Sequence, residues 1–415
     1  MLLLCGQYAP RCPPPRHSCA RQAVVGVARK EQGSLSALVV EKLNSVAWDF
    51  ADARTGDGPH SIHPYPAKFI PQIPRTLIEL FHPGDRSAVL DPFCGSGTTL
   101  VEAMQAGIDS IGIDVNPIAT LVSKVKTTPI STPLGPVARE ITAAARRDVA
   151  AGRVTIPPIP RVDHWFLRPV QEALATTVAE INQVKDADVA DALRVALSSI
   201  IVRVSNQDSD TRYAAIEKKV TREDVWAGFE RAAASVSSAL DGLGDDLFRR
   251  RPSVRIITKD LMTVEPEEVG SDVGLVATSP PYPNAYEYWL YHKYRMYWLG
   301  MDPIAAREVE IGARPHYFKK NHQTEADFER QMGRCFWLLS RVMRPGALAC
   351  FVVGRSIIHG RTIDNEALLE RAATPHGFKK TGSVQRNIAI NRKSFNLAHG
   401  TINREGILVF ALGAK

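Results

Sequence analysis

Short apolar runs alternate with amphipathic segments on either side of the middle of this 415-residue chain. Runs rich in β-branched residues predict buried strands, and segments with apolar residues every three or four positions predict helices. Strands are expected over 87–90, 111–114, 254–262, 273–279, 347–354 and 406–412, and helices over 35–50, 74–81, 98–107, 326–346 and 363–378. This alternation is typical of a mostly parallel sheet with helices on both faces, a doubly wound α/β fold.

The middle of the chain has a different pattern. Helical periodicity recurs there over 137–150, 168–185, 189–205 and 222–240. We therefore predict one α/β domain, over 35–130 and 251–415, that is interrupted by a helical insertion over 131–250. Residues 1–34 are rich in Pro, Arg and Cys and are predicted to form a disordered tail.

Composition and charge narrow the class of protein. The formal net charge of +7 fits a nucleic-acid partner, although many proteins with such a charge bind none. No apolar run approaches the roughly 20 residues of a membrane helix, so we expect a cytoplasmic protein with no membrane partner. The cysteines form no CxxC pair and have no His at zinc spacing, so no metal site is expected. Cys94, Cys335 and Cys350 are expected to be buried thiols.

The segment DPFCGSGTT, residues 91–99, joins a predicted strand to a predicted helix. Its glycines let a ligand approach the backbone closely, and the helix start offers free N–H groups with a partial positive field. The segment lacks the third glycine of the dinucleotide fingerprint and the lysine of the phosphate-binding loop. It is therefore a ligand loop of another kind, or only a tight turn.

Three acids lie at or near the carboxyl ends of predicted strands, at the edge where open parallel sheets bind ligands. Asp91 is expected to face a cationic or amino-bearing group, Asp114 a ribose diol and Asp260 the amine of an adenine. Together these groups suit S-adenosylmethionine better than a pyrophosphate. The alternative is that Asp114 and Asp260 only cap a helix or a turn.

The strand over 273–279 ends in a corner formed by Ser279, Pro280, Pro281 and Tyr282. Two prolines hold the backbone rigid, since proline fixes its own φ and cannot donate to a sheet ladder. The Ser279 hydroxyl and the Pro280 carbonyl can each accept a hydrogen bond from an exocyclic amine, which favours a more nucleophilic nitrogen. Tyr282 can stack on the base for about 1–3 kcal/mol, and a base in a duplex must flip out to reach it. The alternative is a proline-terminated strand with a surface tyrosine.

DPFCGSGTT and TSPPY, preceded by HPYPAKF, resemble the S-adenosylmethionine-dependent amino-methyltransferases of DNA, and SPPY resembles their cytosine-N4 subgroup. The resemblance runs from about residue 60 to the C-terminus. It implies a Rossmann-like class I methyltransferase fold and methyl transfer to cytosine N4 in double-stranded DNA. It also implies a restriction-modification or related role, with a cognate restriction endonuclease as a candidate partner. Members with SPPY often have the reverse motif order, which leaves the location of the target-recognition region open.

The resemblance implies two groups of site residues. The catalytic candidates, which would hold the target amine, are Ser279, Pro280, Pro281 and Tyr282. The cofactor-binding candidates are Lys68, Phe69, Asp91, Pro92, Phe93, Cys94, Gly95, Ser96, Gly97, Thr98, Asp114 and Asp260. His63 is a further candidate beside Lys68 in the HPYPAKF segment.

Basic and aromatic residues in two regions are the candidate DNA contacts. They are Arg212 and Tyr213 in the helical insertion, and Arg314, Lys319 and Lys320 after the corner. The aromatic stripe over 286–298 is expected to be a helix that packs mainly on the core.

Three other functions fit part of the pattern. A DNA adenine-N6 methyltransferase more commonly has Asp or Asn in place of Ser279. An RNA or tRNA base methyltransferase more often has Asp there and an added RNA-binding domain, which this sequence does not reveal. A non-catalytic DNA-binding protein on the same scaffold would have lost motif positions, and none is obviously lost here.

Overall fold

The computed structural model describes residues 34–210, 212–241, 252–284, 286–318, 322–388 and 404–413. The tail predicted for residues 1–34 lies outside them, apart from Ser34, which begins a helix over 34–44. No helix in the described ranges is both long enough and apolar enough to cross a membrane.

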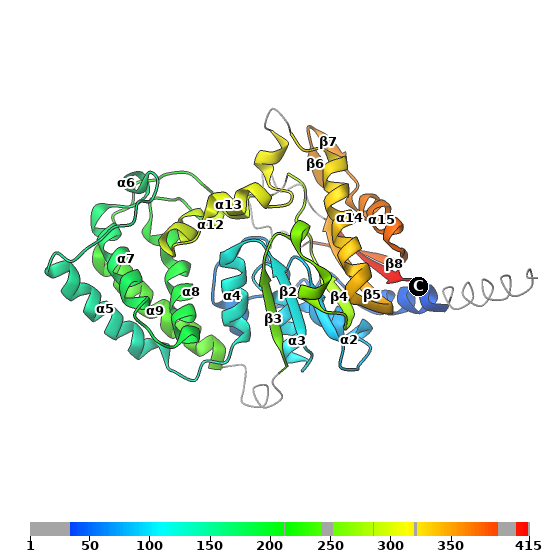
Figure 1. The fold of residues 1–415 in the computed structure, drawn as a ribbon, viewed down its shortest axis with the longest axis horizontal. Helices are drawn as coiled ribbons and strands as arrows, with labels where there is room; N and C mark the ends of the chain where they lie inside the picture. The colour runs from blue at the N-terminus through cyan, green and yellow to red at the C-terminus, as the bar shows by residue number, and fades with distance from the viewer. Residues whose placement is uncertain are drawn as a thin grey trace, which may run out of the picture.

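A seven-stranded sheet forms the centre of the molecule, in the order β3-β2-β1-β4-β5-β9-β8 (Figure 1). The strands from β3 to β5 are parallel, and β9 runs antiparallel to both of its neighbours. The strands are β1 Ala88–Asp91, β2 Ser110–Asp114, β3 Val254–Thr258, β4 Val273–Thr278, β5 Met343–Gly354, β8 Phe378–Asn387 and β9 Arg404–Leu412. A separate hairpin pairs β6 Ser356–Ile358 with β7 Arg361–Ile363. The predicted doubly wound, mostly parallel α/β fold is confirmed.

Alternate residues of the central strands point into two different cores, because successive side chains of a strand face opposite sides of the sheet. On β1, Val89 packs against the α2 face, whereas Leu90 packs against the α14 face. The buried Cys94, Cys335 and Cys350 are free thiols, as predicted. The expected helix over 363–378 is too long: it ends at Ala373, and β8 begins at Phe378.

The helices cover both faces of the sheet. Those nearest to it are α2 Gln72–Phe81, α3 Thr98–Gln105, α4 Pro117–Thr127, α11 Pro266–Val269, α14 Glu325–Val342 and α15 Asn365–Ala373. Short 3-10 turns are η1 Gly58–Ser61, η2 Leu261–Thr263, η3 Arg314–Tyr317 and η4 Thr374–His376.

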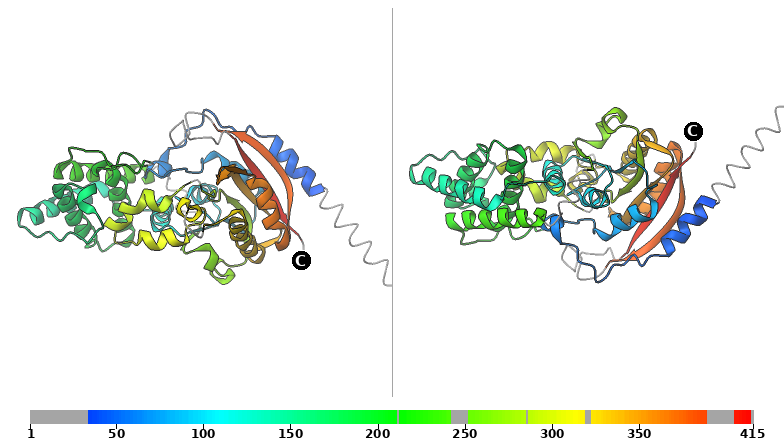
Figure 2. Two further views of the ribbon diagram at one scale, coloured as in Figure 1. Left: turned by 90° about the horizontal axis from the view of Figure 1, so that it is seen from above. Right: turned by 90° about the horizontal axis from the view of Figure 1, so that it is seen from below.

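A second group of helices lies at one end of the molecule, beside β3 and α4, and the views in Figure 2 show the same elongated arrangement. It comprises α5 Leu134–Ala150, α6 Val162–Trp165, α7 Arg168–Ile181, α8 Ala187–Val204 and α9 Arg222–Asp241. These helices share one apolar core with α4 and with α12 Tyr288–Trp298, which follows the proline corner; α13 Pro303–Val309 adds Ala306. The helical region is therefore joined to the sheet through α4 and α12.

Candidate active site

One cavity of about 680 Å³ opens at the carboxyl ends of the parallel strands. This volume is within the usual range for small-molecule sites. All the catalytic candidates and all the cofactor-binding candidates except Gly97 line it. The fold therefore brings together the glycine loop, the three acids and the proline corner, which are far apart in sequence.

Gly97 supports the loop from behind instead of lining the cavity. It starts α3 with a φ of 77°, and a Cβ atom there would lie 2.7 Å from the Ser123 hydroxyl of α4. Lys126, which is fully buried on α4, donates from Nζ to the Ser96 carbonyl at 2.8 Å. The loop is thus held close to α4 by packing and by a buried amine.

Asp91 is buried and fully engaged by its own chain. Its carboxylate accepts hydrogen bonds from the hydroxyls of Thr99 at 2.7 Å and Thr278 at 2.6 Å, and from the Phe93 amide at 3.1 Å. Burial raises the pKa of the carboxyl to about 6. These bonds tie β1, α3 and β4 together beneath the loop. Its predicted contact with an amino group stays a prediction.

The other two acids lie further along the same edge. Asp114 is half-buried and accepts hydrogen bonds from the amides of Gly95 at 2.9 Å and Asn116 at 2.8 Å; burial raises its pKa to about 6. Asp260 caps η2 by accepting from the Met262 amide at 2.9 Å, yet it also lines the cavity. Both acids therefore combine a local turn contact with a position on the cavity wall.

The proline corner is braced by two neighbouring segments. The Asn284 amide donates to the Gly312 carbonyl at 2.9 Å, and its side-chain nitrogen donates to the Ile357 carbonyl of β6 at 2.7 Å. Gly312 has a φ of 78°, and a Cβ atom there would be 2.9 Å from the Tyr282 carbonyl. The Ser279 hydroxyl donates to the Val352 carbonyl at 3.2 Å, so its oxygen keeps lone pairs for another donor. These contacts brace the corner, and the rigidity expected from its prolines stays a prediction.

Two residues that the sequence did not indicate lie behind Tyr282. The Tyr282 hydroxyl donates to Glu405 Oε1 at 3.1 Å, and Glu405 forms an ion pair with Arg386 at 2.5 Å. Burial, with the nearby Glu405 charge, raises the pKa of Tyr282 well above its usual range. Both Glu405 and Arg386 line the cavity. They come from β9 and β8, and no local motif marks them.

The aromatic stripe after the corner divides between core and cavity. Trp298 is buried in the core as expected, whereas Tyr288 and Tyr291 line the cavity. The expectation that the stripe mainly packs is thus too broad, because α12 presents one side to the sheet edge. Glu310 accepts from the Tyr288 amide at 2.9 Å and from the Trp289 amide at 2.7 Å; burial raises its pKa to about 8.

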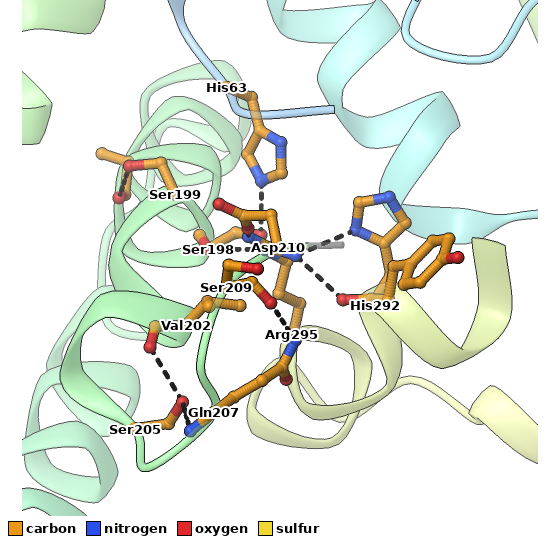
Figure 3. A network of polar contacts seen from close by, with 12 residues as sticks. His63, Ser198, Ser199, Val202, Ser205, Gln207, Ser209, Asp210, His292 and Arg295 are labelled. Carbon is orange, nitrogen blue, oxygen red and sulfur yellow. Dashed lines mark hydrogen bonds and ion pairs between the residues drawn. The ribbon is translucent and has the colours of Figure 1, made fainter. Parts of the chain in front are cut away.

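A buried polar network holds α12 against α8 (Figure 3). The Arg295 guanidinium donates to the carbonyls of Ser198 at 3.0 Å and Tyr291 at 2.9 Å, and it forms an ion pair with Asp210. His63 is buried in the same network, 2.9 Å from the Ser198 hydroxyl. His63 therefore positions α8 and is absent from the cavity wall.

The candidate DNA contacts differ in exposure. Arg314 is exposed at the cavity rim, and Arg212 is exposed in the loop after α8, where it pairs with Asp208. Tyr213 is half-buried and packs against Trp165 and Tyr294, which favours a structural role for its ring. Lys319 and Lys320 lie outside the described residues. All these contacts with DNA stay predictions.

The strand order and the cavity at the carboxyl edge define the Rossmann-like class I methyltransferase fold. Residues 31–123, which include HPYPAKF and the glycine loop, match the family model N6_N4_Mtase, described as DNA methylase. This match confirms the predicted resemblance to the amino-methyltransferases of DNA and supports S-adenosylmethionine as the cofactor. It does not distinguish cytosine N4 from adenine N6.

Curated relatives support the same class. The type II methyltransferase M.MvaI of Kocuria varians is 30% identical over 254 residues, which are 56% of this chain and 55% of the relative. The type II methyltransferase M.MjaII of Methanocaldococcus jannaschii is 52% identical over 68 residues, 16% of this chain and 12% of the relative. The chain thus spans about half the length of the first relative and much less of the second.

Among solved structures, the chain is similar to the rRNA methyltransferase aviRa of Streptomyces viridochromogenes. The TM-score is 0.34 at 13% identity, over 88% of this chain and 91% of that one.

Proposed function

We propose that the protein transfers a methyl group from S-adenosylmethionine to the exocyclic N4 amine of a cytosine in double-stranded DNA. The observation that carries the proposal is the single cavity that contains the three strand-end acids and the Ser-Pro-Pro-Tyr corner. The names of the type II relatives support a restriction-modification role, with a cognate restriction endonuclease as partner.

The residues at one end of the cavity fit S-adenosylmethionine. Carboxylates there can accept from a ribose diol at Asp114 and from an adenine amine at Asp260. The glycine loop lets the ligand approach the start of α3, whose N–H groups carry a partial positive field. When bound, the cofactor supplies an electrophilic methyl group on a sulfonium, and the C–S electron pair stays with the departing sulfur.

The corner prepares the target amine. The Ser279 hydroxyl and the Pro280 carbonyl accept the two N–H hydrogens, which directs the nitrogen lone pair out of conjugation with the ring. After the new N–C bond forms, the nitrogen carries a positive charge and gives one proton to solvent. Tyr282 stacks on the base, which must be flipped out of the duplex to enter the cavity. Rigid bracing by Gly312 and Asn284 keeps the two acceptors in fixed directions.

Adenine N6 in DNA is the second candidate, because the matched family model covers N6 and N4 enzymes alike. Serine at position 279 favours cytosine. The acceptor geometry of the corner would also serve an adenine amine.

The decisive test is incorporation of label from S-adenosylmethionine into unmethylated DNA, followed by digestion to nucleosides. We expect label in N4-methylcytosine, and a loss of rate of at least about tenfold for Ser279→Ala and for Tyr282→Ala. S-adenosylhomocysteine affinity serves as the control and should be unchanged in both variants. Label in N6-methyladenine would establish the second candidate, and full activity of both variants would refute the role of the corner.

A further inference from the structure

The ion pair of Arg386 and Glu405 lies beside Tyr282 at the cavity wall, and Arg386 has hydrogen-bond donors that this pair does not use. We propose that Arg386 recognises the acceptor edge of the flipped-out base, N3 and O2 of cytosine, and that Glu405 holds Arg386 and Tyr282 in place for this. The inference rests on the proposed function and deepens it, because it names a residue that discriminates cytosine from adenine.

The pair is fixed from both sides. Arg386 on β8 donates from Nε to the Trp48 carbonyl at 3.1 Å and from Nη1 to Glu405 Oε2 at 2.5 Å. The side chains are only 5% exposed for Arg386 and 17% exposed for Glu405. Glu405 uses its other oxygen to accept from the Tyr282 hydroxyl. The guanidinium therefore has one orientation, linked through Glu405 to the ring that would stack on the base.

The guanidinium also has donors to spare. Arginine carries five N–H donors, and within the described ranges Arg386 donates only to Trp48 and Glu405. Arg386 lines the same cavity as Ser279, so the remaining donors are available to a ligand. A guanidinium that is held in place at the cavity wall and has unused donors favours a ligand that brings acceptors.

Cytosine brings such acceptors next to its amine. N3 adjoins the carbon that carries the amine, and O2 lies beyond it on the same edge, so two neighbouring acceptors face a forked donor. Adenine has N1 beside its amine but a C–H group at the next position. A guanidinium at this end of the cavity therefore pairs fully with cytosine and leaves a donor unpaired with adenine.

The test compares two DNA substrates after the methylated site has been mapped in DNA treated with the wild-type protein. One duplex has cytosine at the target and the other has 3-deazacytosine, in which N3 is replaced by C–H. The proteins are wild type, Arg386→Met, Arg386→Lys, and Lys379→Met, an exposed cation on the same strand as the matched control. The measurements are kcat/KM for methyl transfer and S-adenosylhomocysteine affinity.

Wild type and Lys379→Met should lose about 10- to 100-fold in kcat/KM on 3-deazacytosine, the loss typical of a hydrogen bond to a charged group. Arg386→Met should be slow on cytosine and lose nothing further on the analogue, while its S-adenosylhomocysteine affinity stays within about twofold of wild type. Arg386→Lys, which keeps the charge, should show intermediate discrimination.

Equal wild-type rates on the two duplexes would overturn this inference and leave the proposed function intact. A lower rate on 3-deazacytosine than on cytosine that persists in Arg386→Met would also overturn this inference and leave the proposed function intact. Label in adenine during the mapping step would overturn both. The wild-type comparison needs no variant, so a misfolded Arg386→Met protein does not remove the test.

Discussion

The carboxyl of Asp114 has a structural role in the turn and a proposed role in binding the cofactor. It is half-buried and held by two backbone amides, and its pKa is raised to about 6 by burial. A ribose diol needs acceptors, which the ionised form supplies. Asp91, with the same pKa of about 6, changes charge in the same range beneath the loop.

We therefore predict that affinity for S-adenosylhomocysteine falls as the pH decreases below about 6. At about pH 5 only about a tenth of the Asp114 carboxyl would be ionised, so its loss alone should make the affinity roughly tenfold weaker than at about pH 7.5. Isothermal titration calorimetry at the two pH values checks this. Asp114→Asn should already bind weakly at the higher pH and should change less between the two.

Unfolding provides the control for that experiment. Both acids have native pKa values of about 6 against the ordinary aspartate value of 3.8, so the native state binds more protons than the unfolded state between these values. Their contribution to stability is therefore fully present below about pH 4 and is lost as the pH rises through 6. These acids contribute more stability at about pH 5 than at about pH 7.5, so weaker binding at the lower pH with no loss of stability from these acids is the expected result. Equal affinity at both pH values would contradict the prediction.

The sequence predicted some of the residues that line the cavity and missed others. Asp91, Asp114 and Ser279 were found because each lies at the carboxyl end of a strand whose apolar run is clear. Glu405 and Arg386 were missed because they reach the cavity only through the pairing of β8 with β9. An isolated charged residue on a strand gives no local signal of where its side chain lies.

Helix α12 is the element that connects the helical region to the cavity. Arg295, toward its C-terminal end, joins the network with α8, and Tyr288 and Tyr291, nearer its start, line the cavity wall. Because α12 follows the proline corner, its position also affects where Tyr282 can lie.

We predict that Asp210→Asn lowers the free energy of unfolding by about 2–3 kcal/mol, because it leaves the buried Arg295 cation without its ion pair. The value is below that for a wholly buried pair, since the Asp210 side chain is 37% exposed. Urea denaturation measures the change. Asp208→Asn breaks the pair with Arg212, which is 75% exposed, and should cost less than about 0.5 kcal/mol. Equal costs for the two variants would contradict this account.

The sequence predicted helices and strands best where a single hydrophobic periodicity, helical or strand-like, dominated the segment. The glycine-loop helix and the last strand were found because their apolar patterns are unambiguous. Strand β8 was missed because it lies at the sheet edge and consists mostly of polar residues, including Lys379, Lys380 and Gln385. The aromatic stripe was predicted to be a helix, as α12 is, but periodicity does not tell which of its tyrosines face a cavity.

At the scale of the molecule, the net charge of +7 and the exposed Arg314 at the cavity rim favour binding of a polyanion there. Arg212 offers a second cationic contact on the helical region. A duplex whose base enters the cavity would pass close to the rim.

We predict that Arg314→Ala weakens DNA binding about equally across sequences and reduces the slope of log affinity against log salt by about one. Fluorescence anisotropy with a labelled duplex at several salt concentrations measures this. Lys379→Ala, an exposed cation on β8, should leave the slope unchanged. An unchanged slope for Arg314→Ala would place the phosphate contacts elsewhere.

Strand β3 forms one edge of the sheet and pairs with β2 from Ser110 to Asp114, although the helices from α4 to α9 separate the two strands along the chain. Closing so long a loop costs entropy before any contact is gained, and such non-local pairings slow folding. We expect the intervening helices to collapse on their own core first, and β3 to dock late. Until then Asp260, which follows β3, is absent from the cavity, so the part of the site proposed to bind adenine is completed only at the end of folding.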